Sequence, residues 1–178
     1  MIQFMVLGLP RSGTTWAANW LTTDRTLCIH DPIARYSFNE LDSLRFGGRV
    51  VGISCTSAWT IPDKINRHEA RKLVLERDMD DVNRSLSGMG MTTITDRCVN
   101  SFDKIEGFRV DYKDLFDPAV APIIWAHLLP HIPFDEFRHK ELCGFHVQPD
   151  LRVAAHDTSI AYRLVKNIRE AINETQRV

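Results

Sequence analysis

The chain has 178 residues, of which 44% are hydrophobic and 25% are charged, as in an ordinary globular protein. This length predicts one sizeable core and a single domain over residues 1–178. The formal net charge of −1 excludes a general attraction to polyanions, so we expect neither a nucleic-acid partner nor a membrane partner.

The N-terminal apolar stretch and the cysteines together predict a cytoplasmic protein. Residues 1–10 carry no basic segment and are interrupted at Gly8 and Pro10, so they fit neither a signal peptide nor a membrane span. The four cysteines have neither C-x-x-C spacing nor the rhythm of metal ligands. We therefore expect reduced thiols and no bound metal.

Short apolar runs alternate with helical segments along the chain, which predicts an α/β fold with a parallel sheet. Most of the runs are nearly continuous rather than alternating, as in strands that are buried on both faces. The expected strands are 2–7, 27–30, 50–54, 72–76 and 108–112.

Helical spacing of apolar residues predicts the segments between these strands. One helix is expected after residue 15 and a second over 38–44. A third begins at the N-cap Asp78 and ends near Gly88 or Gly90, and a fourth covers 117–129 with Pro118 in its first turn. A C-terminal helix is expected from the stripe of Ile160, Leu164, Ile168 and Ile172. Residues 130–158 show little periodicity and are expected to be irregular.

The sequence G-L-P-R-S-G-T-T at residues 8–15 joins the first strand to the first helix. A glycine-bounded loop at this place directs backbone N–H groups and a helix dipole at one point, which predicts a site for a nucleotide phosphate. The spacing matches the Walker A loop, except that Thr14 stands where that loop has lysine. The alternative is an ordinary turn that contains two glycines.

Residues 9–16, L-P-R-S-G-T-T-W, resemble the 5′-phosphosulfate loop of the sulfotransferases that use 3′-phosphoadenosine 5′-phosphosulfate (PAPS). The arginine at position 11 is similar to that of tyrosylprotein and many bacterial members. The resemblance implies that the donor is bound by Pro10, Arg11, Ser12, Gly13, Thr14, Thr15 and Trp16.

A second motif places Arg77 at the end of the fourth strand and Ser85 eight residues later. The carboxyl edge of a parallel sheet is where open α/β folds bind ligands. The pair resembles the 3′-phosphate motif of the same family, which implies that both residues bind the donor. The alternative is that Arg77 pairs with Asp80 or Asp81 and that Ser85 faces solvent.

Residues 110–115, V-D-Y-K-D-L, are similar to the Y-E-D-L segment on the last core strand of the family. The resemblance thus covers the first two-thirds of the chain. It implies a P-loop NTPase-like three-layer sandwich with a five-stranded parallel sheet in the kinase-like order 2-3-1-4-5. The R-K-G-x-x-G-D-W segment of cytosolic members is absent from this sequence.

Sulfuryl transfer requires a base for the hydroxyl acceptor and positive charge near the leaving phosphate oxygen. Arg11 is expected to supply that charge. Cytosolic members carry a catalytic histidine after the third strand, where this chain has none, whereas tyrosylprotein and carbohydrate members place a glutamate after the second strand. Asp31 at that point is the first candidate base and His30 the second, unless both merely form the turn before Pro32.

Other side chains are weaker candidates for the same site. Further bases are sought among His127, His131, His139 and His146, and adenine is expected to stack on Trp59, Phe102 or Phe108, although core packing explains these rings equally well.

The sequence therefore predicts a metal-independent enzyme that transfers a sulfuryl group from PAPS to a hydroxyl acceptor and releases 3′,5′-adenosine bisphosphate. One alternative is a small nucleotide- or nucleoside-kinase-like phosphotransferase with Glu76 or Asp78 as its Mg²⁺ ligand, which the missing loop lysine disfavours. Another is a catalytically silent nucleotide-binding module. The sequence specifies neither the acceptor nor the oligomeric state.

Overall fold

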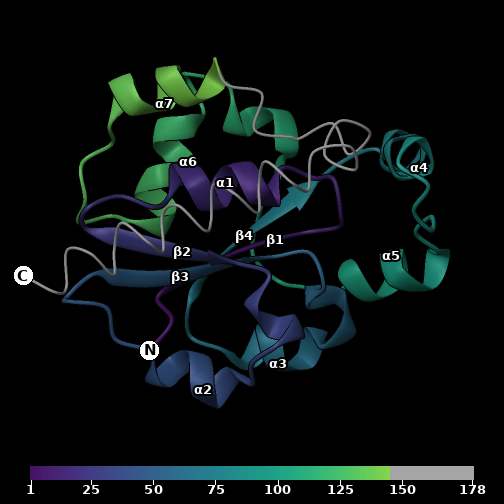
Figure 1. The fold of residues 1–178 in the computed structure, drawn as a ribbon, viewed down its shortest axis with the longest axis horizontal. Helices are drawn as coiled ribbons and strands as arrows, with labels where there is room; N and C mark the ends of the chain where they lie inside the picture. Colours follow the sequence, from purple (N-terminus) through teal and green to yellow (C-terminus); the bar gives the residue numbers. More distant parts are fainter. Residues whose placement is uncertain (145–178) are drawn as a thin grey trace, which may run out of the picture. The chain divides into compact units, whose positions relative to one another are not determined.

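The computed structural model describes residues 1–144, which belong to one compact unit, Met1–Phe145. Its centre is a parallel sheet in the order β2-β3-β1-β4-β5 (Figure 1). The strands are β1 (Phe4–Gly8), β2 (Thr26–His30), β3 (Val50–Cys55), β4 (Arg71–Glu76) and β5 (Phe108–Asp111). The predicted α/β class, the five parallel strands and their order are confirmed.

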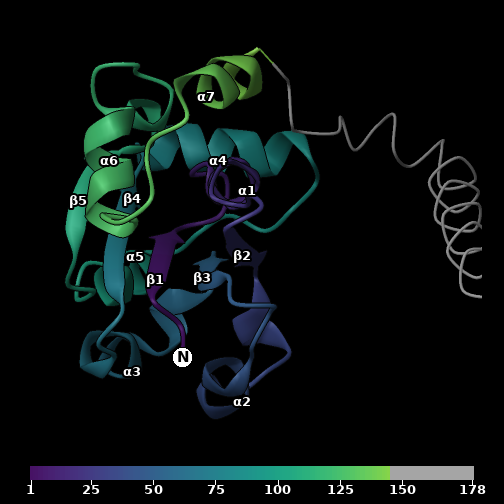
Figure 2. The same ribbon diagram turned by 90° about the vertical axis from the view of Figure 1, so that its left-hand side faces the viewer.

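Helices cover both faces of the sheet and make three layers (Figures 1 and 2). One face carries α1 (Thr14–Trp20), α6 (Ala121–Leu128) and α7 (Glu136–Cys143). The other face carries α2 (Phe38–Ser43), α3 (Pro62–Arg67) and α5 (Asp96–Phe102). Helix α4 (Met79–Gly88) follows β4, and short 3₁₀ turns form η1 (Pro32–Ala34), η2 (Ala58–Thr60) and η3 (Tyr112–Leu115).

The central strand β1 is buried at every position, because β3 and β4 pair with its two edges and helices cover both faces of the sheet. On the α1 side, an aromatic cluster of Trp16, Trp20, Trp125, Phe134 and His139 fills the space under α6 and α7. Burying rings of this size supplies much of the apolar free energy of folding.

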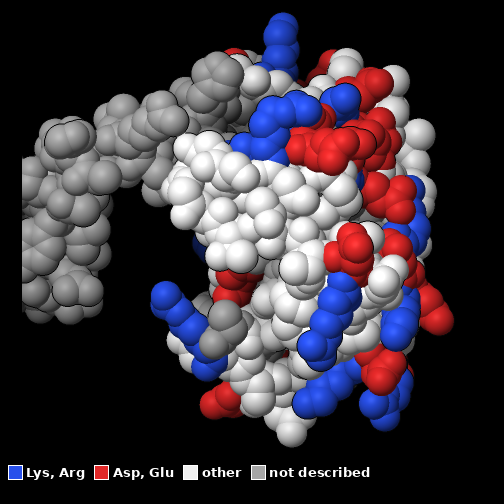
Figure 3. All heavy atoms as spheres, turned by 90° about the vertical axis from the view of Figure 1, so that its right-hand side faces the viewer, with Lys and Arg blue, Asp and Glu red and all other residues white. Residues whose placement is uncertain are grey.

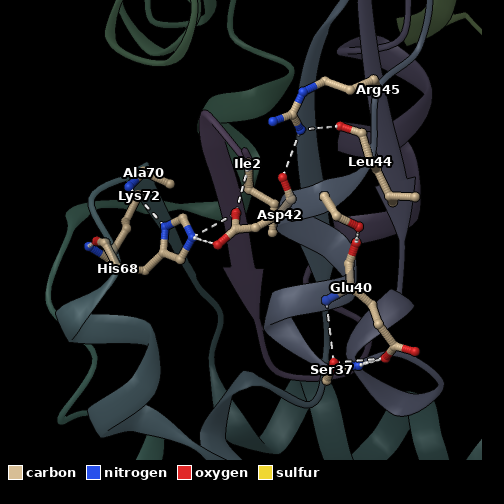
Figure 4. Close-up of polar contacts among 10 residues, drawn as sticks. Ile2, Ser37, Glu40, Asp42, Leu44, Arg45, His68, Ala70 and Lys72 are labelled. Carbon is tan, nitrogen blue, oxygen red and sulfur yellow. Dashed lines mark hydrogen bonds and ion pairs between the residues drawn. The ribbon is translucent and has the colours of Figure 1, made fainter.

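A polar cluster at the amino end of the sheet joins the start of the chain to α2 and the residue after α3 (Figure 4). The Asp42 carboxylate accepts the backbone N–H of Ile2 at 2.9 Å and lies 3.2 Å from His68 Nε2. The other ring nitrogen, Nδ1, accepts the backbone N–H of Ala70 at 3.1 Å. Because both ring nitrogens have partners, the His68 imidazole is fixed in orientation.

Two expectations about the helices are wrong. Helix α6 begins at Ala121 with Pro122 in its first turn, because the Asp117 side chain accepts the Ala119 N–H at 2.8 Å and closes a separate turn first. Residues 130–158 are not irregular throughout, since α7 starts at the N-cap Asp135, whose carboxylate accepts the Arg138 N–H at 2.8 Å.

The expected C-terminal helix with Ile160, Leu164, Ile168 and Ile172 lies outside the described residues. Within residues 1–144, no helix has both the length and the apolar character needed to cross a membrane.

Candidate functional site

The loop between β1 and α1 has the tight path that a phosphate-binding loop requires. Gly13 has φ = +82° and Arg11 has φ = +72°, a left-handed conformation that is uncommon for a residue with a side chain. A Cβ added to Gly8 would lie 3.2 Å from side-chain atoms of both Ser12 and Thr14. The Ser54 hydroxyl donates to the Thr14 carbonyl at 2.7 Å and fixes the loop to β3.

The two arginines of the separate sequence motifs meet beside this loop. Arg11 Nε donates to Ser85 Oγ at 2.9 Å, and an Arg77 N–H donates to the Arg11 main-chain carbonyl. The Arg77 guanidinium also lies over the Tyr112 ring, 4.4 Å from its centroid. Residues from the end of β4, from α4 and from η3 therefore lie around one loop.

The alternative partners of Arg77 are absent in the described part of the chain. Asp81 forms its ion pair with Arg84, at 2.6 Å, and the Asp78 carboxylate caps α4 by accepting the N–H groups of Asp80 and Asp81. Within residues 1–144, no carboxylate lies within ion-pair distance of Arg77.

Two buried polar atoms at this place have no hydrogen-bond partner among the described residues: Ser12 Oγ and Arg77 Nε. Ser12 is 1% exposed, so its hydroxyl does not readily form a hydrogen bond with bulk water. A buried donor without a partner costs free energy, which a ligand oxygen would offset. The pKa of Arg11 is lowered by burial and secondly by the neighbouring charge of Arg77.

The attraction for an anion at this loop is local. Figure 3 shows Lys and Arg intermixed with Asp and Glu on the face toward α4 and α5, without a broad region of one sign. A bound anion would thus be held by the few groups that touch it. More distant surface charges are of both signs, and physiological salt screens them beyond a Debye length of about 8 Å.

His30 and Asp31, the candidate bases, stand at the carboxyl end of β2 next to the loop. His30 Nε2 lies 3.2 Å from Thr15 Oγ1, 3.4 Å from Thr14 Oγ1 and 3.5 Å from Asp31 Oδ2. About a third of each of the His30 and Asp31 side chains is exposed, 35% and 33%. The imidazole therefore reaches the loop and remains accessible to a substrate.

One oxygen of the Asp31 carboxylate is hydrogen-bonded to Thr56, the residue that follows β3. Its Oδ1 accepts both the backbone N–H and the hydroxyl of Thr56, at 2.6 and 2.9 Å. The Asp31 backbone has φ = +48°, and its N–H donates to the Ser54 carbonyl at 2.7 Å. Only Oδ2 points toward His30, so Asp31 is better arranged to orient or stabilise the imidazole than to accept a proton alone.

Trp16 lies apart from the other loop candidates. It is buried in the aromatic cluster, and its indole N–H donates to the Leu142 carbonyl at 3.2 Å. Pro10 and Gly13 are half-buried in the loop, and Thr15 is exposed beside His30. Of the residues expected to bind the donor, Trp16 is thus the one whose side chain packs in the aromatic cluster instead of facing the loop.

The remaining histidines are divided among other parts of the fold. His127 contacts the Lys72 carbonyl at 3.2 Å and packs on Phe108, whereas buried His139 contacts the Leu115 carbonyl at 2.8 Å. His131 lines a different cavity, and His146 lies outside the described residues.

The rings considered for adenine stacking are mainly packing residues. Trp59 packs against the core, and Phe102 belongs to that core and is 4% exposed. Phe108 faces His127 at 5.0 Å between ring centroids. These contacts leave adenine stacking without support at the three positions.

The carboxylates considered for magnesium already have partners. Glu76 pairs with Arg109 at 2.8 Å, and Asp78 caps α4. Among residues 1–144, no group of three His, Cys, Asp or Glu side chains has the arrangement of a metal site.

Sequence reasoning did not single out Tyr112 and Thr56, which contact Arg77 and Asp31. Tyr112 lies within the recognised segment 110–115, so its position after β5 was a usable signal. Thr56 gave no such signal, because its contact depends on the register that brings the ends of β2 and β3 together.

Comparisons with known proteins add no relative: no protein-family model, curated protein or solved structure matches this chain.

Proposed function

We propose that the chain is a sulfotransferase-like enzyme that transfers a sulfuryl group from PAPS to a hydroxyl acceptor. The observation that carries the proposal is the convergence of Arg11, Arg77 and Ser85 beside a tight loop after β1. Arg11 lies 66 and 74 positions from the other two in the sequence, and the two motifs involved both resemble the donor site of one family.

The residues present fit a nucleotide that carries two separate phosphate groups. The 5′-phosphosulfate would contact backbone N–H groups of residues 13–15 and the unpartnered Ser12 hydroxyl, since the Ser12 N–H already donates to the Leu9 carbonyl. The 3′-phosphate would contact Arg77 and Ser85, where a charged N–H lacks a partner among the described residues. Two phosphate sites held by one network favour a 3′,5′-bisphosphate over a simple 5′-nucleotide.

In the proposed reaction, the hydroxyl oxygen of the acceptor attacks sulfur while the bond from sulfur to the bridging phosphate oxygen breaks. The hydroxyl proton passes to a base, and the bridging electron pair leaves with 3′,5′-adenosine bisphosphate. His30 is the better placed base, because it is exposed and lies 3.2 Å from Thr15 of the loop. Asp31 Oδ2 stabilises the imidazolium that forms, and Arg11 balances the charge that develops on the leaving oxygen.

The same contacts weigh against a Mg²⁺-dependent kinase. Such an enzyme needs a loop lysine, where this chain has Thr14, and a carboxylate that is available to the metal. Glu76 is instead paired with Arg109, and Asp78 caps α4. The proposed transfer is therefore independent of divalent metal.

The experiment that tests the proposal incubates the protein with PAPS and a panel of phenolic, carbohydrate and tyrosyl-peptide hydroxyls, in EDTA. Release of 3′,5′-adenosine bisphosphate with an equal amount of sulfated acceptor is the expected result. Transfer of phosphate from ATP·Mg²⁺ would establish the kinase alternative. Tight binding of the bisphosphate with no turnover on any hydroxyl would identify a silent binding module.

A further inference from the structure

An open cavity lies at the opposite end of the sheet from the loop of residues 8–15, where β2 and β3 begin. Its volume is about 360 Å³. The residues that give it chemical character are Asp24, Arg25, Gly47, Gly48, Arg49 and His131. None of them belongs to the proposed donor site, so the cavity requires its own explanation.

The strand register sets Arg25 and Arg49 side by side. Thr26 pairs with Val50 at the start of the two parallel strands, and the Val50 N–H donates to the Arg25 carbonyl at 3.0 Å. Neighbouring strands are about 4.8 Å apart, so the two arginines are immediate neighbours. Both are exposed, and within residues 1–144 no carboxylate forms an ion pair with either.

Adjacent like charges across two strands destabilise a sheet, and an anion that bridges them would reverse the effect. Arginine is also the side chain that best matches a phosphate group, because its planar fork makes two parallel hydrogen bonds. Both arginines line this cavity together with His131.

The backbone of the adjoining turn adds donors of its own. Gly47 and Gly48 both have positive φ, +54° and +77°, and the Arg49 N–H closes the turn on the Phe46 carbonyl at 2.9 Å. The N–H groups of the two glycines have no acceptor among the described residues. A Cβ at either glycine would meet no atom within 4 Å, so the turn is open to a ligand. Consecutive N–H groups in such turns form concave anion sites.

We propose that this cavity binds the phosphate group of a small phosphate monoester, at a site separate from the nucleotide. A cavity of this volume accommodates a phosphate with a carrier of sugar size. Asp24, which also lines the cavity, repels further negative charge, and this favours one phosphate group over a polyphosphate. The inference does not rest on the proposed function.

Amide NMR of the full chain tests the proposal, with inorganic phosphate and ribose 5-phosphate as two separate probes. We expect saturable shifts at the Gly47, Gly48 and His131 amides, with tighter binding of ribose 5-phosphate than of inorganic phosphate. Arg25→Gln and Arg49→Gln should each weaken binding at these amides roughly tenfold, the loss expected for one charge-assisted hydrogen bond. Asp24→Asn should strengthen it.

Two controls separate this site from other phosphate effects. Arg71→Gln changes an exposed arginine at the start of β4 that does not line the cavity, and it should leave the shifts unchanged. Arg77→Ala alters the loop site and should also leave them unchanged, while dispersion in the same spectra reports whether each variant is folded. Absence of saturation, equal responses to chloride, or shifts that survive the Arg25→Gln/Arg49→Gln double substitution would overturn the proposal.

Discussion

Arg77 donates a hydrogen bond to the main-chain carbonyl of Arg11, a residue 66 positions earlier in the chain. The contact joins the end of β4 to the loop after β1, and Ser85 on α4 extends it by accepting from the Arg11 side chain. The two candidate phosphate motifs are therefore one structural unit. Their separation is set before a ligand arrives, which lowers the ordering cost of binding.

Arg77→Ala should weaken 3′,5′-adenosine bisphosphate by roughly tenfold or more, because a charged hydrogen-bond donor to the 3′-phosphate is lost. The affinity for 5′-AMP, which lacks that phosphate, should fall much less. Calorimetric titration of both nucleotides measures the ratio. Arg84→Ala is the matched control, since Arg84 is on the same helix as Ser85 and pairs only with Asp81 among the described residues. Equal losses for the two nucleotides would remove Arg77 from the 3′-phosphate site.

His30→Gln should lower the turnover of sulfuryl transfer by roughly 10²- to 10⁴-fold, the range for loss of a general base. The affinity for 3′,5′-adenosine bisphosphate should be retained, because His30 faces the side chains of Thr14 and Thr15 rather than the loop backbone. Steady-state kinetics and calorimetry on the same preparation separate the two effects.

Asp31→Asn serves as the comparison for His30→Gln. Asparagine keeps an oxygen for the Thr56 hydrogen bonds and loses only the charge near His30, so a smaller fall in turnover is expected. A larger fall in Asp31→Asn than in His30→Gln would make Asp31 the base and His30 its assistant.

The strands could be predicted from the sequence more accurately than the helices. Most of the strands are nearly continuous apolar runs, and such runs have few alternatives to a sheet that is buried on both faces. The exception is β5, Phe-Arg-Val-Asp, at the edge of the sheet. Helix α7 was not predicted because it has no apolar stripe: it packs His139 into the aromatic cluster, while Phe137 on the same helix is exposed. The sheet order came from the family resemblance, not from periodicity.

For the candidate site, the sequence indicated which residues meet but not how they face one another. The motif spacing predicted that Arg77 and Ser85 share an edge with the loop, and both contact Arg11. The orientation of Asp31 depends on a positive φ and on Thr56, which no local pattern encodes. Trp16 fits both the loop motif and the apolar stripe of the first helix. In the structure it belongs to the core, where its indole N–H donates to the Leu142 carbonyl.

Gly52→Ala should destabilise the fold by about 1–3 kcal/mol, the usual cost of overpacking a core. Gly52 is the register partner of Phe4, and an added Cβ would come within 2.2 Å of the Phe4 ring. Gly88→Ala is the control, because a Cβ there meets no atom within 4 Å, and it should change stability by less than about 1 kcal/mol. Urea unfolding monitored by circular dichroism compares the two, and equal stabilities would contradict the packing of Phe4 on β3.

Acid should destabilise the protein partly through Asp42. Burial raises the pKa of this carboxyl, but hydrogen bonds from the Ile2 N–H and His68 outweigh burial and hold the pKa below its ordinary value (Figure 4). The carboxylate therefore stabilises the fold above the unfolded pKa of about 3.9, and this contribution is lost as the pH falls through the lower folded value.

Urea unfolding between about pH 6 and pH 3 tests this contribution. Asp42→Asn should lose less stability than the wild type over that range, because it has no carboxylate to protonate. Asp24→Asn, at an exposed position with no hydrogen bond or ion pair among the described residues, should follow the wild-type curve. Parallel curves for Asp42→Asn and the wild type would show that acid acts elsewhere.

The central claim is that the loop after β1 and Arg77 together hold a 3′,5′-bisphosphate without metal, and thermal unfolding with ligand tests it most directly. A ligand of the folded state at 100 times its Kd adds about 2.7 kcal/mol to the free energy of unfolding, which a melting curve resolves. We predict that 3′,5′-adenosine bisphosphate raises the melting temperature equally with EDTA and with Mg²⁺, and by more than ATP·Mg²⁺ does. A larger rise with ATP·Mg²⁺ that disappears on chelation, or no rise with the bisphosphate, would contradict the account.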